Sequence, residues 1–192
     1  MIDLVYEGLS STTVNRKLAT IRSFYKFLLR SRLIKKDPTC KLKSLKNPKR
    51  LPEFVQESTI DSVLEEAVYD ATFEGQRDKM IMEFLYQTGV RLSELIGLKW
   101  SDINLIEGSV RVLGKRKKER IIPITSVLKR NILSYQKVFE ERFSNGLQSH
   151  YFIETNQGKQ SYPMLIYRTV RHYLDLFAQT SSRSPHVLRH TF

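Results

Sequence analysis

The chain has 192 residues, of which 41% are apolar and 27% charged, a composition typical of a globular protein with one or two domains. A single cysteine, Cys40, excludes an internal disulfide framework and a cysteine-rich metal site, which indicates a reducing compartment. No apolar run approaches the roughly 20 residues that span a bilayer, and the first residues lack a signal-peptide pattern. We therefore expect a soluble, cytoplasmic protein with no membrane partner.

The net charge of +12 is unevenly distributed along the chain. Residues 1–50 carry a net +10, residues 51–113 a net −7 and residues 114–192 a net +9. Because Lys and Arg that neutralise phosphates release condensed counterions, two basic ends fit a bound nucleic acid. Charge that keeps solvated helix faces soluble explains the same distribution equally well.

The first predicted helix begins at the hydroxyl residues 10–12, which are typical helix caps. Its apolar face recurs every three or four residues, at Val14, Leu18, Ile21, Tyr25 and Leu28. Cations suited to a DNA backbone lie beside it, at Arg16, Lys17, Arg22, Lys26 and Arg30. A merely solvated basic face is the alternative.

The segment KLKSLKNPKRLP, residues 41–52, contains five cations and two prolines and predicts an interdomain linker. We place the linker at residues 44–52, between a domain at residues 1–43 and a second at residues 53–192. Its cations Lys46, Lys49 and Arg50 can follow a phosphate backbone, although many linkers are basic without touching DNA.

The rest of the chain is predicted to be helical with one β-hairpin. Helices are expected from residue 58, over residues 78–87 with Gly89 as the stop, after residues 125–126, and after Ser161 with Pro163 in the first turn. Residues 109–124 alternate instead and predict a hairpin with a cationic tip. The expected fold class is mainly α with a small β-hairpin or sheet. The residues predicted to be buried in these helices are Ile60, Val63, Leu64, Ala67, Val68, Met80, Ile81, Phe84, Leu85, Val127, Leu128, Ile132, Leu133, Val138, Ile166, Val170, Tyr173 and Phe177.

Arg91 stands in the segment TGVRLSEL, between the glycine that stops one helix and the start of the next. Backbone N–H groups, the positive end of a helix dipole and a guanidinium would together favour an anion there. The alternative is a surface arginine paired with Glu94.

The predicted hairpin tip, GKRKKER, has five cations in seven residues: Lys115, Arg116, Lys117, Lys118 and Arg120. A lysine at a mobile tip can enter a site and donate a proton, provided that neighbouring positive charge lowers its pKa. A flexible basic turn that binds phosphates without chemistry is the alternative.

His186 and Arg189, in SPHVLRHTF, lie three residues apart and so share one face if the segment is helical. An imidazole and a guanidinium on one face can bind a phosphate and move a proton without a metal. His186 and His190 have the spacing of a metal pair, but no nearby carboxylate or thiol completes such a site. We therefore expect no metal.

Together, TGVRLSELIGLKWSDI, VRVLGKRKKERIIPI and SPHVLRHTF resemble, in order, the first arginine box, the lysine hairpin and the His-x-x-Arg box of the tyrosine recombinase, or phage integrase, family. The Xer-like bacterial members are the most similar. Residues 10–52 resemble the last helices and linker of the family's core-binding domain. The resemblance implies a helical core-binding remnant at residues 1–43 and a mixed α+β catalytic domain at residues 53–192, incomplete at its C-terminus.

The resemblance also implies a chemistry and partners. Arg91 and Arg189 would bind the scissile phosphate, Lys115 would protonate the departing 5′-hydroxyl, and His186 would handle the proton of an attacking tyrosine. Glu94 would orient Arg91. Double-stranded DNA would be cut and rejoined through a 3′-phosphotyrosyl intermediate, without a cofactor, by protomers that assemble as tetramers on paired sites.

All nine tyrosines precede His186, so none occupies the family's nucleophile position. We expect the chain to be a piece of a longer protein, truncated at both ends, that binds DNA weakly and forms no covalent complex alone. A non-catalytic DNA-binding relative, acting as regulator or decoy, is a second interpretation. An RNA-binding or ribosome-associated basic protein is a third, which explains the charge but not the ordered boxes.

Overall fold

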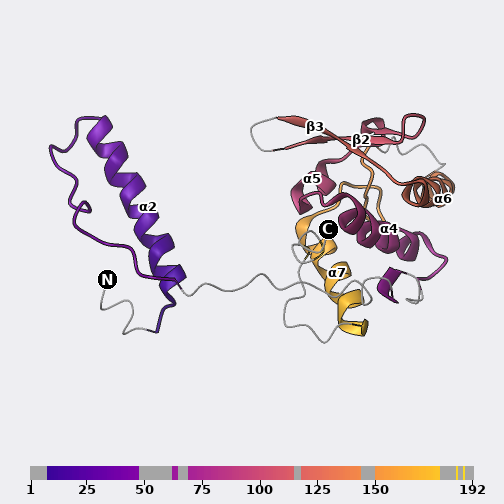
Figure 1. Cartoon of the computed structure of the whole chain (residues 1–192), viewed down its shortest axis with the longest axis horizontal. Helices are drawn as coiled ribbons and strands as arrows, with labels where there is room; N and C mark the ends of the chain where they lie inside the picture. The colour runs from indigo at the N-terminus through magenta and orange to yellow at the C-terminus, as the bar shows by residue number, and fades with distance from the viewer. Residues whose placement is uncertain are drawn as a thin grey trace. The chain divides into compact units, whose positions relative to one another are not determined.

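The computed structural model describes residues 8–47, 62–64, 69–114, 118–143 and 150–177, together with Pro185 and Leu188. The chain divides into two compact units, Met1–Leu51 and Pro52–Phe192 (Figure 1). Within the described residues, no helix combines the length and apolar character needed to cross a membrane.

The first unit consists of helix α2 (Ser11–Arg30) and a segment that returns along it (Figure 1). Ser10 caps the helix as predicted, because its Oγ accepts a hydrogen bond from the Thr13 N–H at 3.3 Å. Val14 and Leu18 are buried, but Ile21 is 45% exposed, so its predicted burial is wrong. In the described part of this unit, one segment packs on α2. This segment is too narrow to bury the whole apolar face of the helix.

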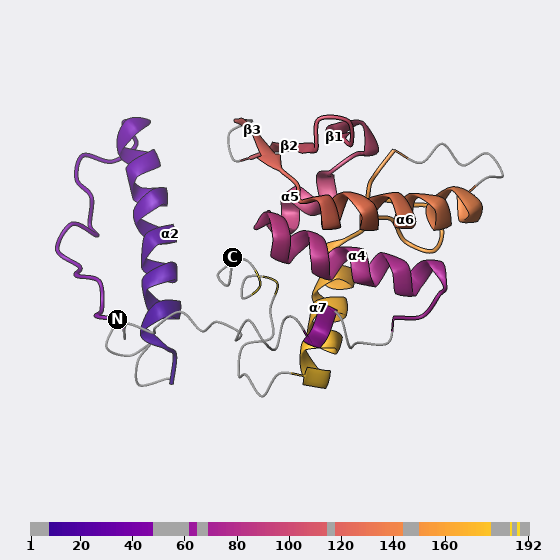
Figure 2. The same cartoon turned by 45° about the vertical axis from the view of Figure 1, so that its right-hand side comes forward.

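The longest described helices of the second unit are α4 (Phe73–Thr88), α6 (Ser126–Phe143) and α7 (Pro163–Phe177). Helices α6 and α7 both pack on α4 (Figure 2). Helix α4 begins five residues before the predicted start, because Thr72 Oγ1 accepts a hydrogen bond from the Gly75 N–H and caps it there. Its predicted core residues are confirmed as buried: Met80, Ile81, Phe84 and Leu85.

The buried face of α6 differs in part from the predicted one. Leu128 and Ile132 are buried as expected, whereas Val127 and Leu133 are more than 40% exposed. The buried positions continue instead at Tyr135, Phe139 and Phe143, which keeps the spacing of three and four residues. On α7, the predicted burial of Ile166, Val170 and Tyr173 is confirmed, while the side chain of Phe177 and most of residues 58–68 lie outside the described residues.

A three-stranded antiparallel sheet covers one side of the helices, in the order β1 (Ile103–Asn104), β2 (Ser109–Leu113) and β3 (Glu119–Pro123). Strands β2 and β3 form the predicted hairpin, with Leu113 opposite Glu119 and Val112 opposite Arg120. The fold is mainly helical with one small sheet, which confirms the predicted class.

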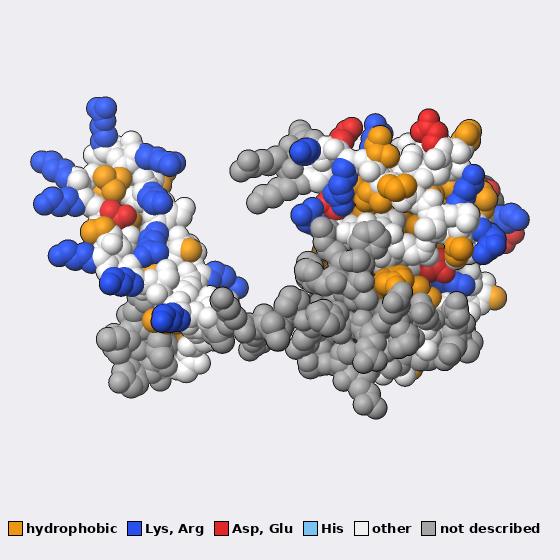
Figure 3. Space-filling view, in the orientation of Figure 1, with side chains coloured by type: hydrophobic (Ala, Val, Ile, Leu, Met, Phe, Trp, Pro, Cys, Tyr) orange, Lys and Arg blue, Asp and Glu red, His pale blue; other side chains and the backbone are white. Residues whose placement is uncertain are grey.

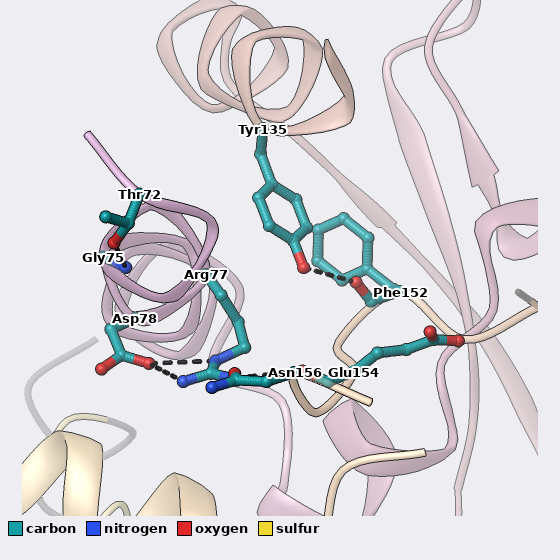
Figure 4. Close-up of polar contacts among 8 residues, drawn as sticks. All are labelled: Thr72, Gly75, Arg77, Asp78, Tyr135, Phe152, Glu154 and Asn156. Atoms are coloured by element: carbon teal, nitrogen blue, oxygen red, sulfur yellow. Dashed lines mark hydrogen bonds and ion pairs between the residues drawn. The ribbon is translucent and has the colours of Figure 1, made fainter. Parts of the chain in front are cut away.

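Arg77 is a buried cation that joins the start of α4 to residues 154–156 (Figure 4). Its guanidinium donates to Asn156 Oδ1 at 2.7 Å, to the Glu154 carbonyl at 3.5 Å and to Asp78 Oδ1 at 3.0 Å. Nearby, the Tyr135 hydroxyl donates to the Phe152 carbonyl at 3.2 Å (Figure 4). These bonds attach the segment after α6 to the helical core.

Candidate active site

Arg91 lies between the end of α4 and the short helix α5 (Leu92–Gly97). Gly89 ends α4 in a left-handed conformation with φ of 57°, and its N–H donates to the Leu85 carbonyl at 3.1 Å, as the sequence predicted. Val90 is buried, so the chain is fixed just before Arg91. The Arg91 side chain is 52% exposed, which leaves its guanidinium accessible to an anion.

Glu94 is the buried centre of the site, with a side chain only 4% exposed. Its Oε2 accepts the Arg91 backbone N–H at 2.7 Å, and its Oε1 accepts Arg91 Nη1 at 2.8 Å. The predicted partnership of Glu94 with Arg91 is therefore present in the geometry. The backbone N–H of Arg91 is occupied by this carboxylate, whereas its guanidinium is exposed enough to bind an anion.

Arg120, at the start of β3, is a site residue that sequence reasoning missed. Its Nη1 donates to Glu94 Oε1 at 2.9 Å and its Nη2 to Glu94 Oε2 at 2.7 Å, a two-pronged ion pair. The signal was present in the alternation of β3, where Arg120 shares its side of the strand with the half-buried Ile122. A cation on the packed side of a strand requires a buried partner.

These contacts determine the protonation of Glu94. Burial alone would raise the pKa of its carboxyl, but hydrogen bonds from Arg120 and from Arg91 outweigh burial and lower the pKa to about 2. The same bond to Glu94 raises the pKa of Arg120. At neutral pH the Glu94 side chain is thus an ionised carboxylate between the guanidiniums of Arg91 and Arg120.

The described residues that flank the hairpin tip are Gly114 and Lys118. Gly114 donates its N–H to the Lys118 carbonyl at 2.9 Å and closes the last described pair before the loop. Of the remaining predicted residues of the boxes, only Lys118 is described, at the base of the loop, where it is exposed. The following predicted residues lie outside the described part of the chain: Lys49, Arg50, Lys115, Arg116, Lys117, His186 and Arg189.

The His-x-x-Arg box is represented by two described residues. Pro185 and Leu188 are helical and buried, and Leu188 belongs to the core that contains α4 and α7 residues. The box is therefore attached to the same core that positions Arg91.

Most of the predicted basic stripe on the first unit is exposed: Arg16, Lys17, Lys26, Arg30 and Lys46. In the space-filling view, Lys and Arg side chains are distributed over the whole visible face of this unit (Figure 3). Arg22 differs, because its guanidinium donates to the Leu42 carbonyl and to Ser44 Oγ at 3.3 Å. It is thus engaged in holding the returning segment on α2.

Three of the described tyrosines are poor nucleophiles. Burial raises the pKa of Tyr69, Tyr135 and Tyr173, and nearby carboxylates raise it further for Tyr69 and Tyr173. A raised pKa disfavours the phenolate, which is the attacking form of a tyrosine nucleophile.

Two family models match the chain. The phage integrase family matches residues 53–192, which include the three helices, the sheet and Arg91. The N-terminal SAM-like domain of phage integrases matches residues 3–32, which include α2. The chain belongs to the phage integrase family, and the resemblance seen in the sequence is confirmed.

Known relatives extend beyond the matched region. Tyrosine recombinase XerD of Yersinia pestis is 37% identical over 186 residues, which are 96% of this chain and 62% of that protein. Tyrosine recombinase XerC of Thermodesulfovibrio yellowstonii is 36% identical over 193 residues, which cover 98% of this chain and 63% of that protein. The chain thus spans about three fifths of the length of these relatives.

Solved structures agree on the fold. The crystal structure of XerA recombinase matches 98% of this chain and 62% of its own, with 26% identity and a TM-score of 0.64. The XerH site-specific recombinase bound to its palindromic difH substrate in a post-cleavage complex matches 97% of this chain and 56% of its own, at 17% identity and a TM-score of 0.80. At that identity the second match shows a shared fold.

Proposed function

We propose that the whole protein is a site-specific DNA recombinase that cuts and rejoins double-stranded DNA through a 3′-phosphotyrosyl intermediate, and that this chain supplies its DNA-binding and phosphate-binding parts. The observation that carries the proposal is the half-exposed Arg91 guanidinium held by the buried Glu94 carboxylate, which also binds Arg120 of the β2–β3 hairpin. Its relatives include the tyrosine recombinases XerD and XerC, which supports the same reaction.

The roles follow from charge and protonation. Arg91 and Arg189 would bind the scissile phosphate and stabilise the negative charge of its pentacovalent transition state. Lys115 would protonate the departing 5′-hydroxyl, and His186 would handle the proton of the attacking tyrosine. Glu94, ionised by its two arginine partners, would hold Arg91 in place without taking part in proton transfer.

The domain organisation is part of the proposal. Residues 1–43 would be the end of the core-binding domain, residues 44–52 a basic linker and residues 53–192 most of the catalytic domain. The exposed cations of α2, together with Lys46, would contact the DNA backbone, with Lys49 and Arg50 of the linker and Arg116, Lys117 and Lys118 of the hairpin. The protein would act in the cytoplasm, as a tetramer on paired DNA sites, without a cofactor.

The first test measures DNA binding by the chain. We expect fluorescence anisotropy to show binding to duplex DNA that weakens with salt at a slope of about −0.9 per neutralised phosphate. Structured RNA of equal length should bind more weakly. Equal or tighter binding to RNA would favour the RNA-binding interpretation.

The second test measures the reaction class. A nicked duplex with free 3′- and 5′-hydroxyls, mixed with orthovanadate, presents a five-coordinate mimic of the phosphoryl-transfer transition state. We expect vanadate to tighten binding of the chain to this duplex by at least about tenfold, because a catalytic site is complementary to the transition state. The Arg91→Ala variant should lose this gain.

A non-catalytic DNA-binding protein is not expected to bind the transition-state mimic more tightly than the same duplex without vanadate. Unchanged affinity in vanadate, with duplex binding intact, would therefore overturn the recombinase proposal and favour the regulator or decoy. The Arg171→Gln variant is the matched control, since this exposed arginine of α7 pairs with Asp175 on its own helix.

A further inference from the structure

We propose that Arg120 is a positioning residue that couples the lysine hairpin to the phosphate-binding Arg91 through the shared carboxylate of Glu94. This inference rests on the proposed function, because it assigns Arg120 a place in the same site. It follows from four hydrogen bonds to Glu94 and from the close approach of one glycine.

The Glu94 carboxylate is fully used. Each oxygen accepts two hydrogen bonds: Oε1 from Arg91 Nη1 and Arg120 Nη1, and Oε2 from the Arg91 N–H and Arg120 Nη2, all between 2.7 and 2.9 Å. Arg91 lies at the start of α5, and Arg120 lies in the sheet. The Glu94 carboxylate therefore links these two elements through side-chain hydrogen bonds. A shift of either guanidinium would leave a buried carboxylate oxygen with one donor fewer.

Two-pronged pairing fixes orientation as well as distance. The fork of Arg120 matches both carboxylate oxygens at once, which a single ammonium cannot do. Because Arg120 is paired with Val112 across the hairpin, the fork holds both strands in register close to the loop.

Gly114 provides the second, independent observation. A Cβ placed on Gly114 would lie 3.2 Å from the Lys118 carbonyl oxygen, 3.4 Å from Arg120 Nη1 and 3.6 Å from Glu94 Oε1. The backbone at the start of the loop therefore lies directly against the ion pair. Lys115 follows Gly114 in the sequence, so the ion pair fixes the described backbone just before that lysine.

An ion pair that only stabilises the fold would have different effects on substitution than one that positions site residues. Buried ion pairs contribute little net stability compared with apolar packing, so stability alone gives a weak reason for this arrangement. A positioning role requires instead that loss of Arg120 changes the transition-state preference more than it changes ground-state DNA affinity.

The experiment compares three variants of the chain. Arg120→Gln removes the fork, and Gly114→Ala crowds the Lys118 carbonyl beside the ion pair with a methyl group, without changing charge. Arg111→Gln is the matched control, because Arg111 is on β2 of the same hairpin and pairs with Asp102. Affinity is measured for intact duplex and for nicked duplex with orthovanadate, and hydrogen exchange is measured on the free protein.

We expect Arg120→Gln and Gly114→Ala to lose most of the vanadate gain, while intact-duplex affinity stays within about threefold of the unsubstituted chain. Exchange should accelerate at the Gly114 amide and in β3 but not in α4. Arg111→Gln should keep both the gain and the exchange pattern.

The proposal is overturned if both test variants keep the gain and the hairpin protection. It is also overturned if the gain is lost only together with an equal rise of exchange in α4, since that indicates general destabilisation. If the unsubstituted chain shows no vanadate gain, the proposed function fails, whereas the exchange arm still decides whether Arg120 orders the hairpin.

Discussion

Asn15 on α2 hydrogen-bonds the backbone of Leu45 with both ends of its side-chain amide. Asn15 Nδ2 donates to the Leu45 carbonyl at 2.9 Å, and the Leu45 N–H donates to Asn15 Oδ1 at 2.8 Å. The Asn15 amide thus satisfies both backbone hydrogen-bonding groups of Leu45, as a neighbouring β-strand would. Asn15 Nδ2 also donates to Asn47 Oδ1 at 3.0 Å, so the bond pattern extends toward the basic linker.

Replacement of Asn15 should release this segment from α2. In Asn15→Asp the two bonds that Nδ2 donates are lost and a carboxylate faces the Leu45 carbonyl, which costs about 1–3 kcal/mol in the free energy of ordering the segment. Hydrogen exchange at the Leu45 amide measures this. Thr20→Ala, which removes a hydroxyl bonded within exposed α2, is the control and should leave Leu45 protected. Protection of Leu45 in Asn15→Asp would contradict the prediction.

Arg22 and Lys26 should behave differently although both belong to the basic stripe. Arg22 is half-buried and bonded to Leu42 and Ser44, whereas Lys26 is exposed. We expect Lys26→Gln to weaken DNA binding and reduce the salt slope by about one, with no change in stability. Arg22→Gln should weaken binding and also loosen residues 42–44.

The comparison is made by salt-dependent anisotropy and hydrogen exchange on the same two variants. Among the described residues of the basic stripe, Arg22 alone has a side-chain hydrogen bond to the returning segment, so Lys26 is a fair control for Arg22. Equal exchange at residues 42–44 in both variants would show that Arg22 contributes to DNA binding but does not hold the returning segment on α2.

Glu94 should stabilise the fold only when it is ionised. Its pKa is lowered to about 2 in the folded protein from an ordinary value of 4.5. The resulting stability, about 3 kcal/mol, is fully present above pH 4.5 and is lost as the pH falls toward 2. We expect chemical denaturation to show a steeper loss of stability in this window for the unsubstituted chain than for Glu94→Gln. Parallel curves for the two proteins would contradict the predicted shift.

The sequence predicted the features of the site that depend on residues close together in the chain. It did not predict the contact between residues far apart in the chain. Gly89 as helix stop and Glu94 as a partner for Arg91 follow from positions within a few residues of one another. The partnership of Arg120 with Glu94 spans 26 residues and depends on how the hairpin folds over α5. The alternation of β3 placed Arg120 on the packed side, but nothing local identified the carboxylate that it meets.

The errors in the predicted core have a similar origin. Helical spacing places Ile21 on the face of Val14 and Leu18, and it places Leu133 beside Ile132. Ile21 and Leu133 are nevertheless more than 40% exposed. Periodicity indicates which residues share a face, whereas the width of the buried stripe depends on what packs against it. On α2 that is one returning segment, and on α6 it is an aromatic cluster that continues through Tyr135 and Phe139.

Arg77 should be required for stability, and its loss should depend on pH. Arg77→Met removes the bonds to Asn156, the Glu154 carbonyl and Asp78, and it leaves the Asp78 carboxylate half-buried without its cation. Removing one partner of a buried pair costs about 3–5 kcal/mol. Chemical denaturation near neutral pH measures this loss, and Arg171→Gln, in an exposed pair, should cost less than about 1 kcal/mol.

The pH dependence identifies the cause. Burial raises the pKa of Asp78, and Arg77 opposes the rise, so Arg77→Met should raise this pKa further. A raised folded-state pKa contributes stability at low pH that is lost as the pH rises through it. The deficit of Arg77→Met should therefore be larger near neutral pH than near pH 4, and the added substitution Asp78→Asn should remove the difference. A deficit independent of pH would instead assign the loss to the bonds with residues 154–156, because those involve no group that titrates in this range.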